Sequence, residues 1–269
     1  MDMNRRSFLA ISGAPLLAEM TAVGATDPHD KAFRELLETF NPTLPGYGLD
    51  HANSLQPMVH DMALALYLVA VAKKGMAVES RRAADQLIAL GNKPAAAMPG
   101  WGLGFGWVVK GYGDYAATAV LGITNATAVW GLFEAYDLTK ETRYRDFALE
   151  VLEAYIARCF VRDRGREGFF LYSDQDFEAG KPVSLNVTAM LMGQCARAAK
   201  YGGDTALQEA AELSAVYLWQ RRQTDPSGVY WAYYDDNDSS KGANDGLHAA
   251  YMVQGYIELD RAGFGSPDI

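Results

Sequence analysis

Two kinds of helical segment alternate along the chain, and this alternation limits the possible folds more than any other feature of the sequence. The first kind is alanine-rich and apolar around most of its circumference, and it occurs at residues 54–74, 117–137, 185–201 and 247–262. The second kind has apolar residues on one side only, and it occurs at residues 79–90, 142–160 and 204–222. A helix that is apolar on all sides must be surrounded by protein, whereas a one-sided helix lies at the surface. The sequence therefore predicts inner helices that alternate with outer helices.

The expected fold class is all-α, with about four helical hairpins in one domain that spans residues 26–269. Residues 30–40 supply the fourth outer helix, and the turns Lys74-Gly75 and Gly202-Gly203 join inner helices to the outer helices that follow them. On the outer helices, Leu152 and Tyr217 belong to the apolar stripes, and we expect both side chains to be buried.

Three long loops, residues 99–114, 165–184 and 225–246, return the chain from an outer helix to the next inner one. They are rich in aromatic and acidic residues. Loops of this length in a compact domain are usually functional or disordered, and their aromatic content argues against disorder. We therefore expect these loops to carry the functional site.

A repeat of about sixty residues relates the helices and loops to one another. Near the starts of the inner helices it selects the polar residues His60, Asn125, Asn186 and His248, at intervals of 65, 61 and 62 residues. In the preceding loops it selects Asp50, Asp114, Asp174 and Asp235, at intervals of 64, 60 and 61 residues. The repeat predicts that these two sets lie at the same end of the helical bundle.

This pattern of hairpins resembles the (α/α) toroid of glycoside hydrolases, polysaccharide lyases and sugar epimerases. Those toroids often contain six hairpins, so a chain with about four would form an incomplete ring. The C-terminal domain of uronyl C5-epimerases is similar in having this reduced number. The resemblance implies parallel inner helices and a protein that acts on a polysaccharide or oligosaccharide.

The N-terminal segment resembles a Tat export signal. Arg5-Arg6 precedes Phe8, Leu9 and a short apolar run, although Asn4 stands where Ser or Thr is usual. Cleavage after Ala25 would remove residues 1–25. We expect the Tat machinery to be a partner and the mature protein to be periplasmic or secreted.

Composition excludes several other classes of protein. A net charge of −9 and a pI near 5.0 argue against binding to nucleic acid, which requires a basic face. The uncharged stretch 115–133 contains Thr, Asn and Gly residues, so it suits a buried helix better than a membrane span. Cys159 and Cys195 are interpreted as core thiols, although a single bridge between them stays open.

Parallel inner helices would direct their N-termini and positive dipole ends toward one cavity, which would favour an anion such as the carboxylate of a uronic acid. Aromatic rings there could stack on sugar rings. The candidate substrate-binding residues are His60, Trp101, Trp107, Tyr230, Trp231, Tyr233, Asp50 and Asp174.

Two kinds of catalysis fit these residues. In uronate lyases and epimerases, Asn125 and Asn186 would neutralise the sugar carboxylate, while His248 with Tyr115 or Tyr251 would move the C5 proton. In a glycoside hydrolase, two carboxylates such as Asp114 and Asp235 would act as acid and base. We favour uronate chemistry because of the helix N-termini and the Asn and His residues, and a non-catalytic glycan-binding protein is the third alternative.

No cofactor or metal is expected. The acidic run at residues 235–239 has alternating oxygen ligands, but Ser240 replaces the glycine of a calcium loop and no glutamate closes it.

Overall fold

The computed structural model describes residues 28–39, 44–49, 56–91, 98–109, 112–163, 166–226, 228–236 and 244–264. The predicted export signal and Asp50 lie outside these residues. Within the described ranges there are eight α-helices: α1 (Pro28–Thr39), α2 (Asp61–Lys73), α3 (Ala77–Gly91), α4 (Gly122–Thr139), α5 (Thr142–Cys159), α6 (Leu185–Lys200), α7 (Thr205–Gln220) and α8 (Gly246–Arg261).

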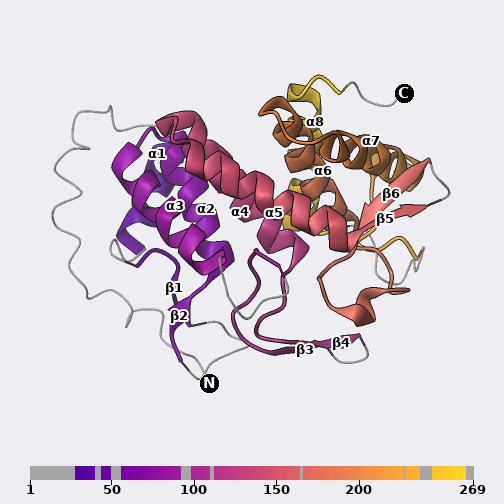
Figure 1. Cartoon of the computed structure of the whole chain (residues 1–269), viewed down its shortest axis with the longest axis horizontal. Coiled ribbons are helices and arrows are strands. Elements are labelled where there is room, and N and C mark those ends of the chain that lie inside the picture. The colour runs from indigo at the N-terminus through magenta and orange to yellow at the C-terminus, as the bar shows by residue number, and fades with distance from the viewer. Residues whose placement is uncertain are drawn as a thin grey trace.

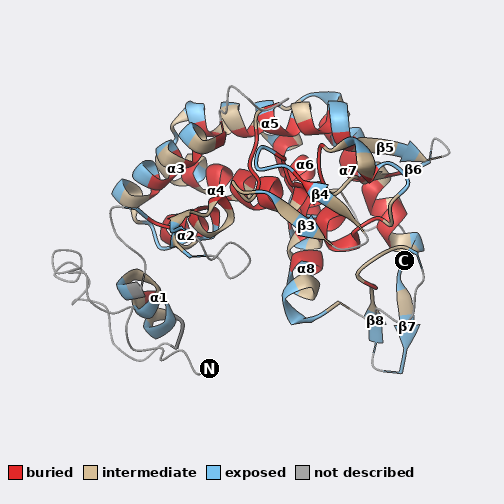
Figure 2. Ribbon diagram, turned by 90° about the horizontal axis from the view of Figure 1, so that it is seen from below, coloured by how far each residue is buried: buried red, intermediate tan, exposed pale blue. Residues whose placement is uncertain are grey.

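Inner and outer helices alternate as predicted. The inner helices contact one another in the order α2, α4, α6, α8, and α3, α5 and α7 each pack on the inner helix that precedes them (Figure 1). In α6 every residue from Leu185 to Ala198 is buried, in agreement with a sequence that is apolar around most of the helix. Figure 2 shows buried residues concentrated in α4 and α6. The arrangement confirms the incomplete (α/α) toroid.

The outer helices bury the apolar stripes that their sequences contain. Leu152 of α5 and Tyr217 of α7 are both buried, as expected. The predicted fourth outer helix corresponds to α1, which lies beside the end of α2 through Phe33 and an ion pair between Asp30 and Lys74. Cys159 and Cys195 are buried, unbridged thiols, so the core-thiol interpretation holds.

Close contact between α6 and α8 depends on glycine. A Cβ atom added to Gly255 would lie 2.1 Å from the carbonyl oxygen of Ala189, and one added to Gly193 would lie 2.7 Å from the carbonyl oxygen of Gly255. Neither distance is possible for a real side chain. The two glycines therefore allow the backbones of the last two inner helices to meet.

Short antiparallel hairpins in the loops are the main feature that the sequence did not predict. The pairs are β1 (Tyr47–Gly48) with β2 (Met58–Val59), β3 (Trp107–Val109) with β4 (Gly113–Tyr115), β5 (Phe160–Asp163) with β6 (Glu167–Phe170), and β7 (Gln223–Asp225) with β8 (Gly228–Tyr230). A single 3-10 turn, η1 (Asp176–Glu178), follows β6. Each sheet has only two strands, so the all-α class is unchanged. None of the helices in the described ranges is long and apolar enough to cross a membrane.

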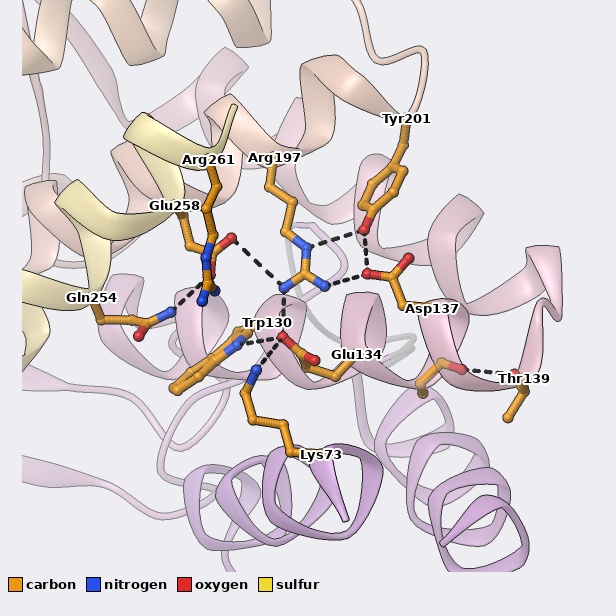
Figure 3. A network of polar contacts seen from close by, with 11 residues as sticks. Lys73, Trp130, Glu134, Asp137, Thr139, Arg197, Tyr201, Gln254, Glu258 and Arg261 are labelled. Atoms are coloured by element: carbon orange, nitrogen blue, oxygen red, sulfur yellow. Dashed lines mark hydrogen bonds and ion pairs between the residues drawn. The ribbon is translucent and has the colours of Figure 1, made fainter. Parts of the chain in front are cut away.

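The C-terminal ends of the inner helices are joined by a buried ionic network around Arg197 of α6 (Figure 3). The guanidinium lies 2.8 Å from Glu134 and 2.7 Å from Asp137, both on α4, and 3.9 Å from Glu258 of α8. Lys73, the last residue of α2, lies 3.0 Å from the same Glu134 carboxylate. Burial opposes charge at Glu134, but Arg197 and Lys73 hold the pKa of its carboxyl below the usual range. All four inner helices therefore end on the same side of the molecule.

We predict that Arg197→Met destabilises the fold by about 3–5 kcal/mol, because it removes the buried cation that Glu134, Asp137 and Glu258 share and leaves only the more exposed Lys73 and Arg261 beside two of these carboxylates. Urea denaturation measures the change. The matched control is Arg162→Met, since Arg162 pairs with Glu209 at the surface, where each side chain is 49% exposed. That change should cost at most about 1 kcal/mol. Equal effects of the two substitutions would contradict the role assigned to the network.

Candidate functional site

A cavity of about 460 Å³ lies where the N-terminal ends of the four inner helices meet. The helices line it with Met62 of α2, Ile123 and Thr124 of α4, Asn186 and Val187 of α6, and Leu247, His248 and Tyr251 of α8. The loops complete the lining with Leu103, Phe105, Trp107, Leu121, Tyr172 and Tyr233. We call this the N-terminal cavity. It lies at the opposite end of the inner helices from the Arg197 network.

Aromatic rings form much of the wall of the N-terminal cavity. Trp107 stacks on Tyr115 with 5.5 Å between ring centroids, and a small recess of about 50 Å³ continues between Trp107, Tyr172 and Tyr234. Burial raises the pKa of Tyr172 and of Tyr233 above the usual range. These phenols are therefore protonated at neutral pH, and the wall offers flat apolar faces together with hydroxyl donors.

His248 enters the cavity from the first turn of α8, and Asp245 holds it there. Oδ1 of Asp245 accepts the backbone N–H groups of Leu247 and His248, both at 3.0 Å, and so caps the helix. Oδ2 of the same carboxylate lies 2.7 Å from Nδ1 of His248. Hydrogen bonds from the backbone and side chain of His248 lower the pKa of Asp245. With Nδ1–H donated to an ionised carboxylate, a neutral His248 ring carries its lone pair on Nε2.

Asn186 and Thr124 bring polar groups to the cavity from the starts of α6 and α4. Both residues are about 1% exposed. Within the described part of the chain, Oγ1 of Thr124 and Nδ2 of Asn186 make no hydrogen bond of normal geometry. The Asn186 side chain nevertheless lies near the Tyr233 hydroxyl. Burial raises the pKa of Tyr233, and the interaction with Asn186 partly offsets this rise. Tyr233 and His248 are in edge-to-face contact, with ring centroids 4.7 Å apart, so Asn186, Tyr233 and His248 are neighbours in the wall of the cavity.

Glu178, which the sequence did not single out, is a buried carboxyl bonded to two tyrosines of the aromatic recess. It accepts the Tyr115 and Ser173 hydroxyls, both at 2.9 Å, and the Tyr112 hydroxyl at 3.3 Å. Burial raises the pKa of the Glu178 carboxyl, although the hydroxyl groups that donate to it act in the opposite direction. Tyr115, an expected base, thus has its hydroxyl directed to Glu178.

Asp174 and Asp235 hold the loops onto the helix starts. Asp174 Oδ1 accepts the N–H of Val120 at 3.0 Å, and Asp235 Oδ1 accepts the N–H of Val183 at 2.8 Å. Asp235 also accepts the Tyr217 hydroxyl. The two aspartates make the same contact one repeat apart, so the sixty-residue repeat extends to individual hydrogen bonds. Their carboxylates are occupied by structural contacts and do not line the cavity.

Several other predicted residues lie away from the cavity wall. Trp101 is fully buried and donates its indole N–H to the carbonyl of Leu87, while its backbone N–H donates to Oδ1 of Asn125. Asn125 therefore secures a loop in the core. Asp114 is exposed on β4, and Nε2 of His60 lies 3.2 Å from the carbonyl of Gly48.

Tyr230 lies on β8. Trp231 donates its indole N–H to the carbonyl of Leu218 on α7 and lies beside Val253 and Ile257 of α8, outside the cavity. Of the predicted site residues, the structure brings Asn186, His248, Trp107 and Tyr233 together around the cavity. In the residues that the structure describes, no three His, Cys, Asp or Glu side chains gather in a group that could hold a metal ion.

Comparison with solved structures defines the class of fold. The chain is similar to an endo-β-1,4-glucanase from Acetobacter xylinum, with a TM-score of 0.61 and 10% identity over 90% of this chain and 75% of that one. It is similar to an unsaturated glucuronyl hydrolase specific for heparin, with a TM-score of 0.62 and 10% identity over 89% of this chain and 69% of that one. A D-mannose isomerase matches with a TM-score of 0.55 and 12% identity, over 80% of this chain and 58% of that one. The resemblance to (α/α)-toroid proteins is confirmed in the fold.

No protein-family model and no curated protein sequence matches the chain.

We predict that Asp235→Ala lowers the free energy of unfolding by about 2 kcal/mol, because it leaves the Val183 N–H and the Tyr217 hydroxyl without their acceptor. Asp114→Ala is the matched control, and as an exposed residue Asp114 should change stability by less than about 0.5 kcal/mol. Thermal or urea unfolding of the two variants makes the comparison. An unchanged free energy of unfolding in Asp235→Ala would contradict the role of Asp235 in holding the loop.

Proposed function

We propose that this protein is an exported carbohydrate-active enzyme that acts on a uronate-containing glycan as a lyase or C5-epimerase. The observation that carries the proposal is the convergence of Asn186, His248 and Tyr233 on one aromatic-walled cavity at the inner-helix N-termini. Removal of the C5 proton of a uronic acid needs a base, a group that stabilises the charge reaching the carboxylate, and a proton donor. These three residues can supply all three.

In the proposed reaction, Nε2 of His248 takes the proton from C5, and the electrons of the broken C5–H bond move into the sugar carboxylate to give an enediolate. The Asn186 amide donates to this anion, where a hydrogen bond gains most strength in the transition state. Asp245 keeps His248 in the tautomer with a free Nε2 and stabilises the imidazolium that forms.

Two outcomes then follow for the enediolate. In a lyase, the enediolate returns to a carboxylate and its electron pair forms the C4=C5 double bond while the C4–O bond breaks. The electron pair of that bond leaves with the oxygen, and the protonated Tyr233 phenol donates a proton to it. In an epimerase, a proton returns to C5 from the opposite face. Tyr251 lines the same cavity and is the second candidate donor.

A glycoside hydrolase is the second candidate, and the likeness to an endo-β-1,4-glucanase and a glucuronyl hydrolase favours it. Hydrolysis requires two carboxyl groups on either side of the glycosidic bond. No Asp or Glu is found among the described residues that line the N-terminal cavity. The uronate reaction is therefore the better account of this cavity.

We expect His248→Ala to lower kcat on a uronate polymer by about 10²- to 10⁴-fold, because it removes the general base. Tyr233→Phe should slow lyase turnover by roughly a hundredfold if the phenol donates to the leaving oxygen. Ultraviolet absorbance of an unsaturated product measures lyase activity, and exchange of the C5 hydrogen with solvent deuterium measures epimerase activity. The control is Tyr256→Phe, which also removes a tyrosine hydroxyl and should leave turnover unchanged because Tyr256, on α8, does not line the N-terminal cavity.

Release of reducing sugar from a neutral glycan, with neither signal on any uronate polymer, would replace this proposal with the hydrolase. Binding of a uronate polymer with no reaction at all would instead favour a glycan-binding protein.

Export rests on the twin-arginine motif at the start of the sequence. Replacement of Arg5 and Arg6 by Lys should leave a full-length precursor in the cytoplasm, visible on an immunoblot of cell fractions. Continued appearance of a shortened periplasmic form would contradict export by the Tat machinery.

A further inference from the structure

Two helix starts in the N-terminal cavity present backbone N–H groups that have no partner in the described residues. The first N–H groups of α4 and α6, at Gly122 and Leu185, donate to the loop carbonyls of Tyr172 and Tyr233 at 2.8 and 3.0 Å. The next two N–H groups of each helix cannot bond within the helix, and neither helix has a side-chain cap. By contrast, Asp245 caps α8.

These uncapped positions are the ones that line the cavity. They are Ile123 and Thr124 at the start of α4, and Asn186 and Val187 at the start of α6. An uncapped helix start alone could simply be hydrated, but two buried side chains add polar atoms at the same place. Oγ1 of Thr124 and Nδ2 of Asn186 belong to residues that are about 1% exposed, and both atoms lack a hydrogen bond of normal geometry in the described structure.

The chemistry of this group of atoms selects an anion. Helix N-termini carry positive partial charge, and the amide and hydroxyl can both donate hydrogen bonds. Leu121 and Val187 also contribute apolar surface, which suits an anionic group attached to a carbon ring better than a free inorganic ion.

We propose that the space between the N-termini of α4 and α6 binds the carboxylate of an acidic sugar. This subsite rests on the proposed uronate function in its choice of ligand. The subsite specifies that α4 and α6 receive the carboxylate, and this sets the orientation of the sugar ring. C5, which bears the carboxylate, then lies next to these helix starts, and His248 reaches it from α8.

The test uses the full mature chain and two related sugars. Methyl β-D-glucuronide carries the carboxylate, and methyl β-D-glucoside is its neutral counterpart. Titration followed by amide nitrogen NMR should give the largest shifts at Ile123, Thr124, Asn186 and Val187, and the glucuronide should bind at least tenfold more tightly. Asn186→Asp should abolish this preference, since it replaces the amide donor by a negative charge of the same shape. Thr124→Val should weaken glucuronide binding by about threefold to tenfold.

The matched control is Thr127→Val on the same helix, because the Thr127 hydroxyl bonds to the carbonyl of Ile123 within α4 and leaves no group aimed at the cavity. It should bind the glucuronide as the parent does. If Asn186→Asp fails to fold, Thr124→Val and the amide shifts still decide the question. Equal binding of the two sugars, or shifts centred on α8 instead of α4 and α6, would overturn the subsite.

Failure of the subsite and failure of the proposed reaction give different results. Glucuronide binding at α4 and α6 without any C5 chemistry would keep the subsite and remove the reaction. C5 chemistry that is insensitive to Thr124→Val, with no amide shifts at the starts of α4 and α6, would keep the reaction and remove the subsite.

Discussion

The common direction of the four inner helices is the constraint on which the rest of this structure depends. The inner helices α2, α4 and α6 each pass to the outer helix that follows through a tight turn at one end of the bundle, and each long loop returns the chain at the other end. Charged residues therefore collect at the C-terminal ends, where Arg197 joins α4, α6 and α8, and uncapped N–H groups collect at the N-terminal ends. The parallel arrangement produces a cavity with positive helix dipoles on several sides, without any basic side chain in its described lining apart from His248.

The loops are tied to the helix starts in a way that also sets the cavity wall. Tyr172 and Tyr233 accept the first N–H of α4 and of α6 with their backbone carbonyls, while both residues also line the cavity. Asp174 and Asp235, two residues farther along, close the same junctions with their carboxylates. Because backbone bonds to rigid helices fix the two tyrosines, the wall is organised before any ligand arrives, and this lowers the cost of binding.

The sequence predicted the helices well because each kind of helix has its own apolar pattern. The predicted 142–160 and 185–201 correspond to Thr142–Cys159 and Leu185–Lys200. The start of α2 was placed seven residues early: the helix begins at Asp61, and Met58–Val59 directly before it form strand β2. The loop hairpins were missed because two to four residues per strand give no readable alternation.

The site was predictable only in part, because the sequence shows which polar residues lie at one end but not what each of them contacts. Asn125 and Asn186 appear alike in the repeat. In the structure one amide bonds to the backbone of Trp101 in the core, and the other lines the cavity. The Asp245 carboxylate both caps α8 and accepts a hydrogen bond from the His248 imidazole. This double contact depends on the geometry of the local turn, which the sequence does not show. Glu178 becomes notable only through the tyrosines that fold over it from another loop.

We propose that the N-terminal cavity is the sugar site. The most direct measurement is a crystal structure of the mature protein with a bound uronate oligosaccharide. Our account predicts a sugar ring against Trp107, Tyr172 and Tyr233, with its C5 hydrogen facing Nε2 of His248. An ordered sugar bound elsewhere, for instance in the charged hollow around Arg197, with the N-terminal cavity occupied only by water, would contradict it.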